Sequence, residues 1–226
     1  MSPKDNPVKV PGIMPQKDGS YAVTIECPGG LVEARVLETL SRVAREKGAL
    51  VHPTTAQKFM LLGLSLDDAR WVIGLFDEMG LGSLVRKARD LSHPRVCVGT
   101  PYCKYAFQDT LGFSGFLYES LARVPIKPKL KVAIAGCPAC CSWANVMDLG
   151  FVGVRSGYKV FIGGHGGARP IAGQEVHVIK TWEQAERLLR ALASLFNDTV
   201  QKKARVDRVI KKVGLERVLE VIKEGL

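Results

Sequence analysis

The sequence predicts an α+β protein in which a β-α-β-α unit comes first, an α/β unit follows, and helices form the C-terminus. Three observations carry this prediction. Short apolar runs alternate with helically spaced apolar residues over residues 20–90. From residue 92 onward Gly, Pro and Cys interrupt short apolar runs, and from residue 181 apolar residues recur at helical spacing.

The length and composition place the chain among globular proteins. Its 226 residues can form one large domain or two small ones, and 46% of them are hydrophobic and 24% charged. This composition excludes disordered, collagen-like and coiled-coil chains. No apolar run approaches the ~18–20 residues that span a bilayer, and the first residues lack the apolar core of a signal peptide. We therefore expect a cytoplasmic protein without a membrane partner.

The first two elements are expected within residues 1–48. Residues 1–19 are rich in Pro and predict an irregular leader. Residues 21–27 have the composition of a short strand, which the Pro-Gly-Gly sequence at 28–30 ends. Apolar residues then recur at helical spacing until Gly48, so a helix follows the strand.

A second strand and helix complete residues 20–90. Residues 49–53 predict the strand. Ser65, with Asp68 three residues later, predicts a capped helix start, and the helix is expected to end before Gly80. These elements form a β-α-β-α unit, which is about half of a ferredoxin-like sandwich.

The second unit, residues 91–180, is predicted around two buried strands at 131–135 and 158–162. It also carries much of the excess positive charge, because residues 121–170 hold seven basic side chains and a single acidic one, Asp148. Such a surface is either simply solvated or attracts anions, such as nucleic-acid phosphates, a polycarboxylate cofactor or a small oxyanion.

Residues 181–226 are predicted to form the C-terminal helices. Thr181 and Gln184 have the spacing of a capping box, and a break is expected near Gly214. The basic tail, residues 200–226, also carries acidic residues and has no aromatic side chains to stack on bases. We therefore expect a helical face packed on the core and no nucleic-acid partner.

Four of the six cysteines form two spaced pairs, Cys97 with Cys103 and Cys137 with Cys141. Disulfides are rare in the cytosol, so metal binding is the first interpretation, and a disulfide or inert buried thiols are the alternative. The C-x5-C loop is longer than zinc sites use, and four thiolates from two loops can hold a [4Fe–4S] cluster. The C-x3-C spacing predicts a helical turn that begins at Pro138 and places both thiolates on one face.

The other two cysteines fall outside this pattern. Cys27 is expected to be a buried strand residue, and Cys140 is expected to point away from the cluster.

The two pairs, in the settings Val96-Cys-Val-Gly-Thr and Ala135-Gly-Cys-Pro-Ala-Cys-Cys, resemble the signature of the sirohaem-dependent sulfite and nitrite reductases. Further segments also resemble that family, at residues 26–30, 52–57, 148–153 and 162–167. The length resembles that of its small, single-repeat members, the assimilatory-type sulfite reductases.

This resemblance implies the cofactors and the reaction. Cys97, Cys103, Cys137 and Cys141 would hold the [4Fe–4S] cluster, and Cys141 would also bridge to the iron of sirohaem. The enzyme would reduce sulfite to sulfide, or nitrite to ammonia, by six electrons from an external donor such as a ferredoxin-like protein. The local positive charge suits a polycarboxylate cofactor and an anionic substrate.

The resemblance also implies a wider set of site residues. The strand after position 51 would contact the cofactor, through His52, Thr54, Thr55, Gln57 and Lys58. The lysines that precede the third cysteine, Lys129 and Lys131, would bind the substrate anion. Arg95 and Lys104 join the expected catalytic site because they lie beside cluster cysteines in the sequence. The alternative is that these lysines are simply solvated.

Two departures from the family open an alternative. The family commonly has arginines where this chain has Thr24 or Glu26 and, in the second strand, Ala56. Their loss favours a non-catalytic iron–sulfur protein that transfers electrons or assists assembly. A zinc-stabilised nucleic-acid binder fits the net charge of +10 but not the cysteine spacing.

The chain contains only one β-α-β-α unit, which is half of a ferredoxin-like sandwich. This unit leaves a sheet edge and an apolar face uncovered, so we predict a homodimer that covers them. Lys129 and Lys131 of one subunit would then face the haem of the other. The alternative is a monomer in which helices from residues 181–226 cover that face.

Overall fold

The computed structural model describes residues 10–87, 91–124, 126, 130–199 and 204–226. The chain divides into two compact units, Met1–Asp90 and Leu91–Leu226. Each unit has its own hydrophobic core. Within the described parts of the chain, every helix is too short or too polar to span a bilayer.

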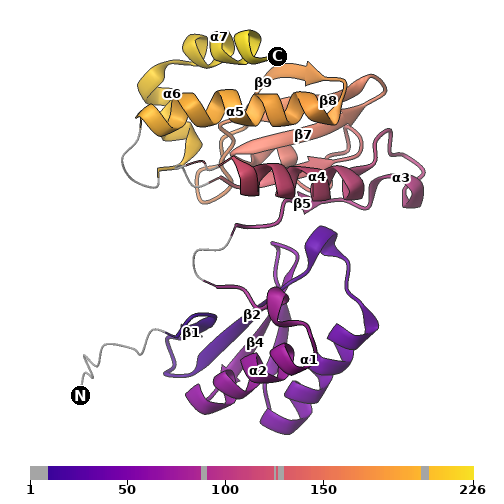
Figure 1. Ribbon diagram of the computed structural model, residues 1–226, viewed down its shortest axis with the longest axis vertical. Coiled ribbons are helices and arrows are strands. Elements are labelled where there is room, and N and C mark those ends of the chain that lie inside the picture. Colours follow the sequence, from indigo (N-terminus) through magenta and orange to yellow (C-terminus); the bar gives the residue numbers. More distant parts are fainter. Residues whose placement is uncertain (1–9, 88–90, 125, 127–129, 200–203) are drawn as a thin grey trace. The chain divides into compact units, whose positions relative to one another are not determined.

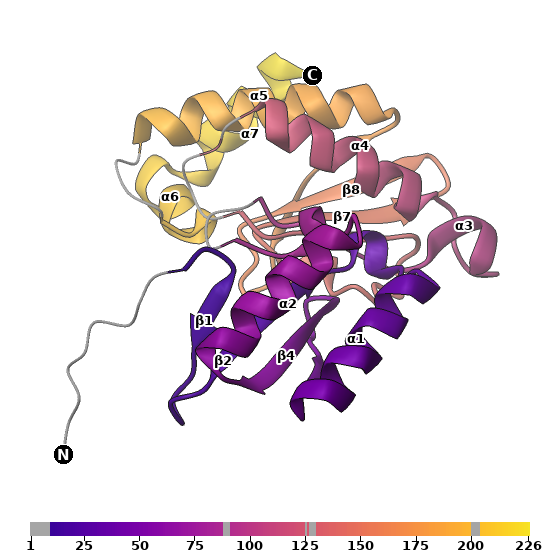
Figure 2. The same ribbon diagram turned by 60° about the horizontal axis from the view of Figure 1, so that its bottom comes forward.

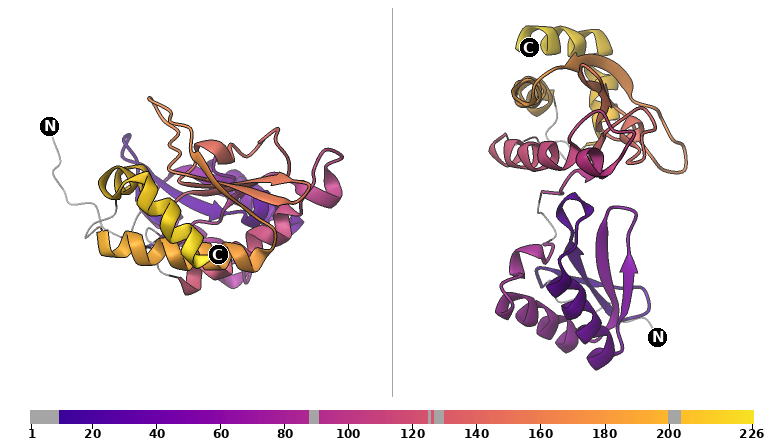
Figure 3. Two further views of the ribbon diagram at one scale, coloured as in Figure 1. Left: turned by 90° about the horizontal axis from the view of Figure 1, so that it is seen from above. Right: turned by 90° about the vertical axis from the view of Figure 1, so that its right-hand side faces the viewer.

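The N-terminal unit is a two-layer sandwich with both helices on one face of an antiparallel sheet (Figure 3, right). The sheet order is β1-β2-β4-β3. Ile25, Leu61 and Phe76 are fully buried between the layers. The elements are β1 (Ile13–Pro15), β2 (Tyr21–Glu26), α1 (Ala34–Lys47), β3 (Leu50–Pro53), β4 (Lys58–Leu64) and α2 (Leu66–Glu78), and two 3-10 turns occupy Pro28–Gly30 and Gly82–Leu84.

The predicted fold class is confirmed in this unit, with two strands that the sequence analysis missed. Ile13–Pro15 forms β1 within the stretch that was expected to be irregular, because it pairs with β2. The other missed strand is β4, which forms a hairpin with β3. The turn between them lacks the Gly or Pro that marks most turns. Gln57 supplies the left-handed residue of that turn, with φ 57°. The predicted helix cap is confirmed, since the Ser65 side chain accepts a hydrogen bond from the Asp68 N–H at 3.0 Å.

The C-terminal unit has a mixed sheet in the order β5-β6-β7-β8-β9. Strands β5, β6 and β7 run parallel to one another. Strand β8 pairs antiparallel with both β7 and β9. Helices α4 and α5 lie side by side along one face (Figures 1 and 2). The elements are β5 (Arg95–Val96), α3 (Gly99–Tyr102), α4 (Thr110–Arg123), β6 (Val132–Ala135), η3 (Ala144–Val146), β7 (Leu149–Val154), β8 (Gly157–Ile162), β9 (Gln174–Ile179), α5 (Trp182–Thr199), α6 (Val206–Val213) and α7 (Leu215–Gly225).

The two faces of this sheet bury different side chains. Val132 and Ile134 of β6 face the large core under α4 and α5. Ala133 and Ala135 face a small cluster with residues of the η3 segment. The segment that follows the second cysteine pair therefore covers the opposite face of the sheet.

The predicted C-terminal elements are confirmed. Strands β6 and β8 occupy the two predicted apolar runs. The capping box forms, because Gln184 N–H donates to Thr181 Oγ1 at 3.4 Å and Thr181 N–H donates to Gln184 Oε1 at 3.2 Å. Gly214, with φ 86°, separates α6 from α7. Val206 and Val218, which are fully buried, join both helices to the same core as the sheet.

Asp148 precedes β7, and its fully buried carboxylate joins three segments of the C-terminal unit. Oδ2 accepts from Lys131 N–H at 2.9 Å, while Oδ1 accepts from Arg205 Nε at 2.8 Å and from Val206 N–H at 3.4 Å. Burial raises the pKa of Asp148, and the Lys131 N–H and the Arg205 guanidinium oppose that rise. The starts of β6, β7 and α6 are therefore held together by one carboxylate.

Candidate metal centre and active site

The two cysteine loops leave the same edge of the sheet. Cys97 directly follows β5, and Cys137 follows β6 after one residue, Gly136. The two strands are parallel neighbours, with Val96 opposite Ile134, so their carboxyl ends lie together. Ligands of α/β sheets commonly bind at such an edge.

The loops are packed tightly against each other. The Gly136 N–H donates to Cys97 Sγ at 3.1 Å, and the Gly136 carbonyl accepts from Phe107 N–H at 2.8 Å. A Cβ at Gly136 would lie 3.1 Å from Ala106 Cβ and 3.3 Å from Gly99 Cα, closer than side chains normally pack. Glycine at position 136 thus lets the first loop approach the second.

All six thiols are free, and the four predicted ligands are accessible to different extents. Cys97, Cys103 and Cys137 are half-buried, and Cys141 is exposed. Among the described residues, no three Cys, His, Asp or Glu side chains converge closely enough to hold a single metal ion. The donor set is four thiols on two adjoining loops, one of them already receiving a backbone N–H, and this chemistry fits a larger iron–sulfur centre.

The predicted helical turn over residues 137–141 is wrong. The segment consists of turns, because Cys140 and Trp143 have left-handed backbone angles, with φ 52° and 57°. The buried Ser142 hydroxyl donates to the Ile134 carbonyl at 2.7 Å and fastens the loop to β6. The Cys140 thiol lies 3.6 Å from Asn145 Oδ1, so it is directed at the segment that follows the loop.

Two of the four predicted catalytic cations lie near the cysteines. The Arg95 guanidinium carbon lies 5.4 Å from the ring centroid of Trp143, in the second loop. Arg95 Nε is buried and has no hydrogen-bond partner among the described residues, and burial lowers the pKa of Arg95. Lys104 follows Cys103, and its ammonium lies 4.9 Å from the ring centroid of Tyr105.

The other two predicted cations are not placed at the cysteines. Lys129 lies outside the described residues. Lys131 immediately precedes β6, whereas Cys137 follows the other end of that strand. Six residues at ~3.3 Å each correspond to about 20 Å, so Lys131 does not reach the cysteine loops of its own chain.

Apart from Cys141, the predicted cofactor-binding residues belong to the β3–β4 hairpin of the N-terminal unit. His52 and Thr55 are exposed near its tip. Thr54 Oγ1 accepts from Lys58 N–H at 3.2 Å and closes the turn. The Gln57 amide packs over Gly30, where a Cβ would lie 2.8 Å from Gln57 Nε2.

A buried charge cluster in the same unit was missed by the sequence analysis. The Glu26 carboxylate, 7% exposed, accepts from Lys58 Nζ at 2.6 Å and from the Arg86 guanidinium. Burial lowers the pKa of Lys58, and Glu26 opposes that effect. The Lys58 ammonium therefore neutralises Glu26, although the sequence analysis assigned it to the cofactor. Recognition of β4 would have placed Glu26 opposite Lys58, but no local signal points to Arg86.

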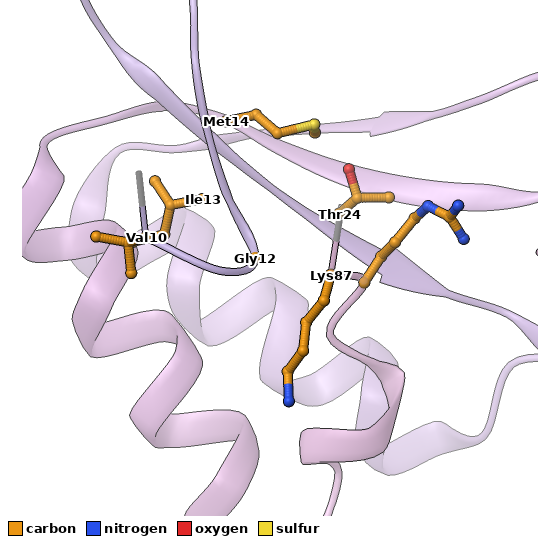
Figure 4. A pocket seen from close by; sticks show the side chains of 7 residues that line it. Val10, Gly12, Ile13, Met14, Thr24 and Lys87 are labelled. Atoms are coloured by element: carbon orange, nitrogen blue, oxygen red, sulfur yellow. The ribbon is translucent and has the colours of Figure 1, made fainter. Parts of the chain in front are cut away.

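The N-terminal unit also contains a buried cysteine and a small cavity. Cys27 is buried as expected, and burial raises the pKa of its thiol. A cavity of about 60 Å³ lies beside Thr24, with the Lys87 ammonium directed away from that hydroxyl (Figure 4). Its volume suits a few water molecules and is too small for a haem-type macrocycle.

Comparison with known proteins identifies the family. Residues 87–226 match the model of the nitrite and sulphite reductase 4Fe-4S domain, and residues 14–79 match that of the nitrite/sulfite reductase ferredoxin-like half domain. The chain belongs to the nitrite and sulfite reductase family. Membership in this family confirms the predicted oxidoreductase class and the predicted cofactor pair, a [4Fe–4S] cluster and sirohaem.

Relatives of very different length are similar to this chain. An assimilatory-type sulfite reductase of Nitratidesulfovibrio vulgaris is 28% identical over 93% of this chain and 96% of its own. A nitrite reductase [NAD(P)H] of Bacillus subtilis is 27% identical over 92% of this chain, which spans only 26% of that protein.

Two solved structures share the fold at low identity. The NirA protein of Mycobacterium tuberculosis matches with a TM-score of 0.73 and 21% identity, over 95% of this chain and 42% of its own. The dissimilatory sulfite reductase I also has a TM-score of 0.73, with 14% identity, over 90% of this chain and 69% of its own. Both matches confirm the fold class.

Proposed function

We propose that this chain is an assimilatory-type sulfite reductase that reduces sulfite to sulfide by six electrons and accepts nitrite as a second substrate. The observation that carries the proposal is the pair of packed cysteine loops at one sheet edge. Sulfite is favoured because the similarity to the assimilatory-type sulfite reductase covers 93% of this chain and 96% of that protein.

Cys97, Cys103, Cys137 and Cys141 are the proposed ligands of the [4Fe–4S] cluster. Cys141 is also the proposed bridge to the sirohaem iron, which its exposed position supports. When bound, the two groups store electrons and pass them to the substrate. The Gly136 N–H stabilises negative charge on the Cys97 sulfur, and hydrogen bonds of this kind tune the potential of such clusters.

Cationic side chains are proposed to hold the substrate anion and the cofactor carboxylates. Arg95 and Lys104 lie by the cysteine loops, and the unsatisfied Nε of Arg95 is a donor available to an anion. The exposed tip of the β3–β4 hairpin supplies polar groups for cofactor carboxylates, from His52, Thr54, Thr55 and Gln57. Lys58 contributes indirectly, since it cancels the charge of Glu26.

The proposed function also includes an electron donor and a cellular location. The proposed electron donor is an external, ferredoxin-like protein. The proposed location is the cytoplasm, where cysteines stay reduced and can serve as cluster ligands. The alternative, a non-catalytic electron-transfer or assembly protein, is favoured by Glu26 and Ala56 in place of the family's arginines.

Turnover with a small reductant separates the enzyme from the alternative. The holoprotein, mixed anaerobically with reduced methyl viologen and sulfite, is expected to release one sulfide for every six viologen radicals oxidised. Nitrite in place of sulfite is expected to give ammonia at the same ratio. Viologen oxidation that does not respond to either anion, in protein with both cofactors bound, would instead support the non-catalytic alternative.

A homodimer is proposed because Lys131 cannot serve the cysteine site of its own chain. Lys131 would reach the substrate only in a site shared between two copies. Light scattering at micromolar concentration is expected to give about twice the chain mass of 24.6 kDa. A particle of 24.6 kDa with full sulfite turnover would remove the shared site and the role of Lys131 in it.

A further inference from the structure

A cavity of about 450 Å³ lies in the C-terminal unit, outside the cysteine loops. Its walls come from β9, from the first turn of α5 and from the end of α7, close to the end of the chain (Figure 1). Small-molecule sites commonly have volumes of ~300–1,000 Å³, so this cavity has the size of a ligand site. The lining residues are His177, Val178, Lys180, Gln184, Lys223 and Leu226.

Basic side chains line this cavity, and no Asp or Glu does. Lys180, Lys223 and His177 form no ion pair with any carboxylate in the described parts of the chain, the α-carboxylate of Leu226 included. On the neighbouring strand, by contrast, Lys159 is paired with Glu175 at 2.9 Å. The positive charge of the cavity is therefore not neutralised within the fold, and it attracts anions.

The Gln184 side chain is held so that it offers hydrogen-bond donors. Its Oε1 accepts from Lys180 N–H at 2.6 Å and from Thr181 N–H at 3.2 Å. Because these bonds occupy the oxygen, the amide nitrogen keeps two N–H groups for another partner. Within the described ranges that nitrogen has no protein acceptor. The amide and the two ammonium groups are donors, so the cavity suits a ligand that presents anionic oxygens.

The size and the walls of the cavity indicate a ligand with more than one anionic group. A single phosphate, sulfate or sulfite ion would fill only a small part of about 450 Å³. Lys180 follows β9, whereas Lys223 lies on α7, so each ammonium can hold a separate anionic group. Val178 and Leu226 add apolar surface, which the skeleton that joins those groups can contact.

We propose that this cavity binds a small polyanion, a molecule with two or more phosphate or carboxylate groups on a short skeleton. Lys180 and Lys223 each bind one anionic group, and the Gln184 amide donates to one of them. The inference does not rest on the proposed function, because the lining residues belong neither to the cysteine loops nor to the β3–β4 hairpin. Three strand spacings of ~4.8 Å separate β9 from β6, the strand that leads to the second cysteine pair.

Calorimetric titration of the holoprotein tests this site without any measurement of turnover. The probes are pyrophosphate, tricarballylate and, as a single anion, sulfate, all at the same ionic strength. The variants are Lys180→Gln and Lys223→Gln, singly and together, and both positions are exposed, so the core stays intact. The matched control is Lys211→Gln, at an exposed position of α6 outside the cavity. The visible spectrum is recorded with each titration, to show that the cofactors stay bound.

The expected result is one polyanion bound per chain, with sulfate bound more weakly. Each single lysine variant weakens polyanion binding on the order of tenfold, because a charge-assisted hydrogen bond is lost, and the control binds as the wild type does. The bound polyanion also raises the midpoint of thermal unfolding of the wild type but not of the double variant. Binding of pyrophosphate alone would assign the site to phosphates, and binding of tricarballylate alone would assign it to carboxylates; both results support the proposal.

Three results would overturn the proposal. The first is that neither polyanion binds the wild type at millimolar concentration. The second is that the lysine variants bind as the wild type does, or that Lys211→Gln weakens binding equally, since net charge alone would then explain the attraction. The third is loss of sirohaem absorbance from the purified double variant, which would assign the cavity to the carboxylates of the cofactor.

Discussion

Cys141→Ser is expected to abolish binding of both cofactors, whereas Cys140→Ser is expected to retain them. Cys141 is exposed at the end of the second loop and is assigned to the cluster and to the haem iron. Cys140 has a left-handed backbone and directs its thiol at Asn145, 3.6 Å away. Loss of a direct thiolate ligand should cost more than the ~10–100-fold in affinity that outer-shell partners are worth.

Iron content and the visible spectrum of the two variants, purified anaerobically side by side, measure this difference. Cys140→Ser should match the wild type in both, with a stability change within ~1 kcal/mol. The two cysteines are adjacent and chemically identical, so each variant serves as the matched control for the other. Equal iron and haem contents in both variants would contradict the assignment of Cys141.

Asp148→Ala is expected to destabilise the C-terminal unit strongly. It leaves the Arg205 guanidinium, 19% exposed, without its carboxylate and removes the acceptor of two backbone N–H groups. Removal of one partner from a buried ion pair typically costs ~3–5 kcal/mol, because the other charge stays buried and unpaired.

Urea unfolding followed by circular dichroism measures the loss. The control is Lys159→Ala, which breaks the exposed pair of Lys159 with Glu175 and should cost no more than ~1 kcal/mol. Asp148→Asn keeps an acceptor oxygen and is expected to fall between the two. A loss for Asp148→Ala no larger than that of the control would contradict the role of this carboxylate in joining β6, β7 and α6.

Elements with local signals were predictable from the sequence. Ser65 with Asp68, and Thr181 with Gln184, marked helix starts because a cap is formed by residues only three positions apart. The two cysteine pairs were found for the same reason, since each spacing is short and unusual. The break at Gly214 follows from the conformational freedom of glycine.

Features that depend on distant contacts were not predictable. The second cysteine loop has helix-compatible spacing, yet the bond from Ser142 to Ile134 and the left-handed angles at Cys140 and Trp143 make it a series of turns. Strand β4 was missed because its turn carries no Gly or Pro, and its side chains are too uniformly apolar to alternate.

The charge cluster around Glu26 was also unpredictable, because it too depends on residues that are distant in sequence. Arg86 lies 60 positions from Glu26 in sequence, and only the folded N-terminal unit brings them together. Lys131 shows the converse, because its sequence proximity to Cys137 suggested a shared site, whereas the strand between them keeps them apart.

The central claim is that four cysteines on two loops hold a cluster next to sirohaem, and the metal and sulfide content of anaerobically purified holoprotein tests it most directly. A [4Fe–4S] cluster with one haem iron predicts about five iron atoms and about four acid-labile sulfides per chain, together with sirohaem absorbance. One zinc ion per chain without labile sulfide, or iron without haem absorbance, would contradict the account.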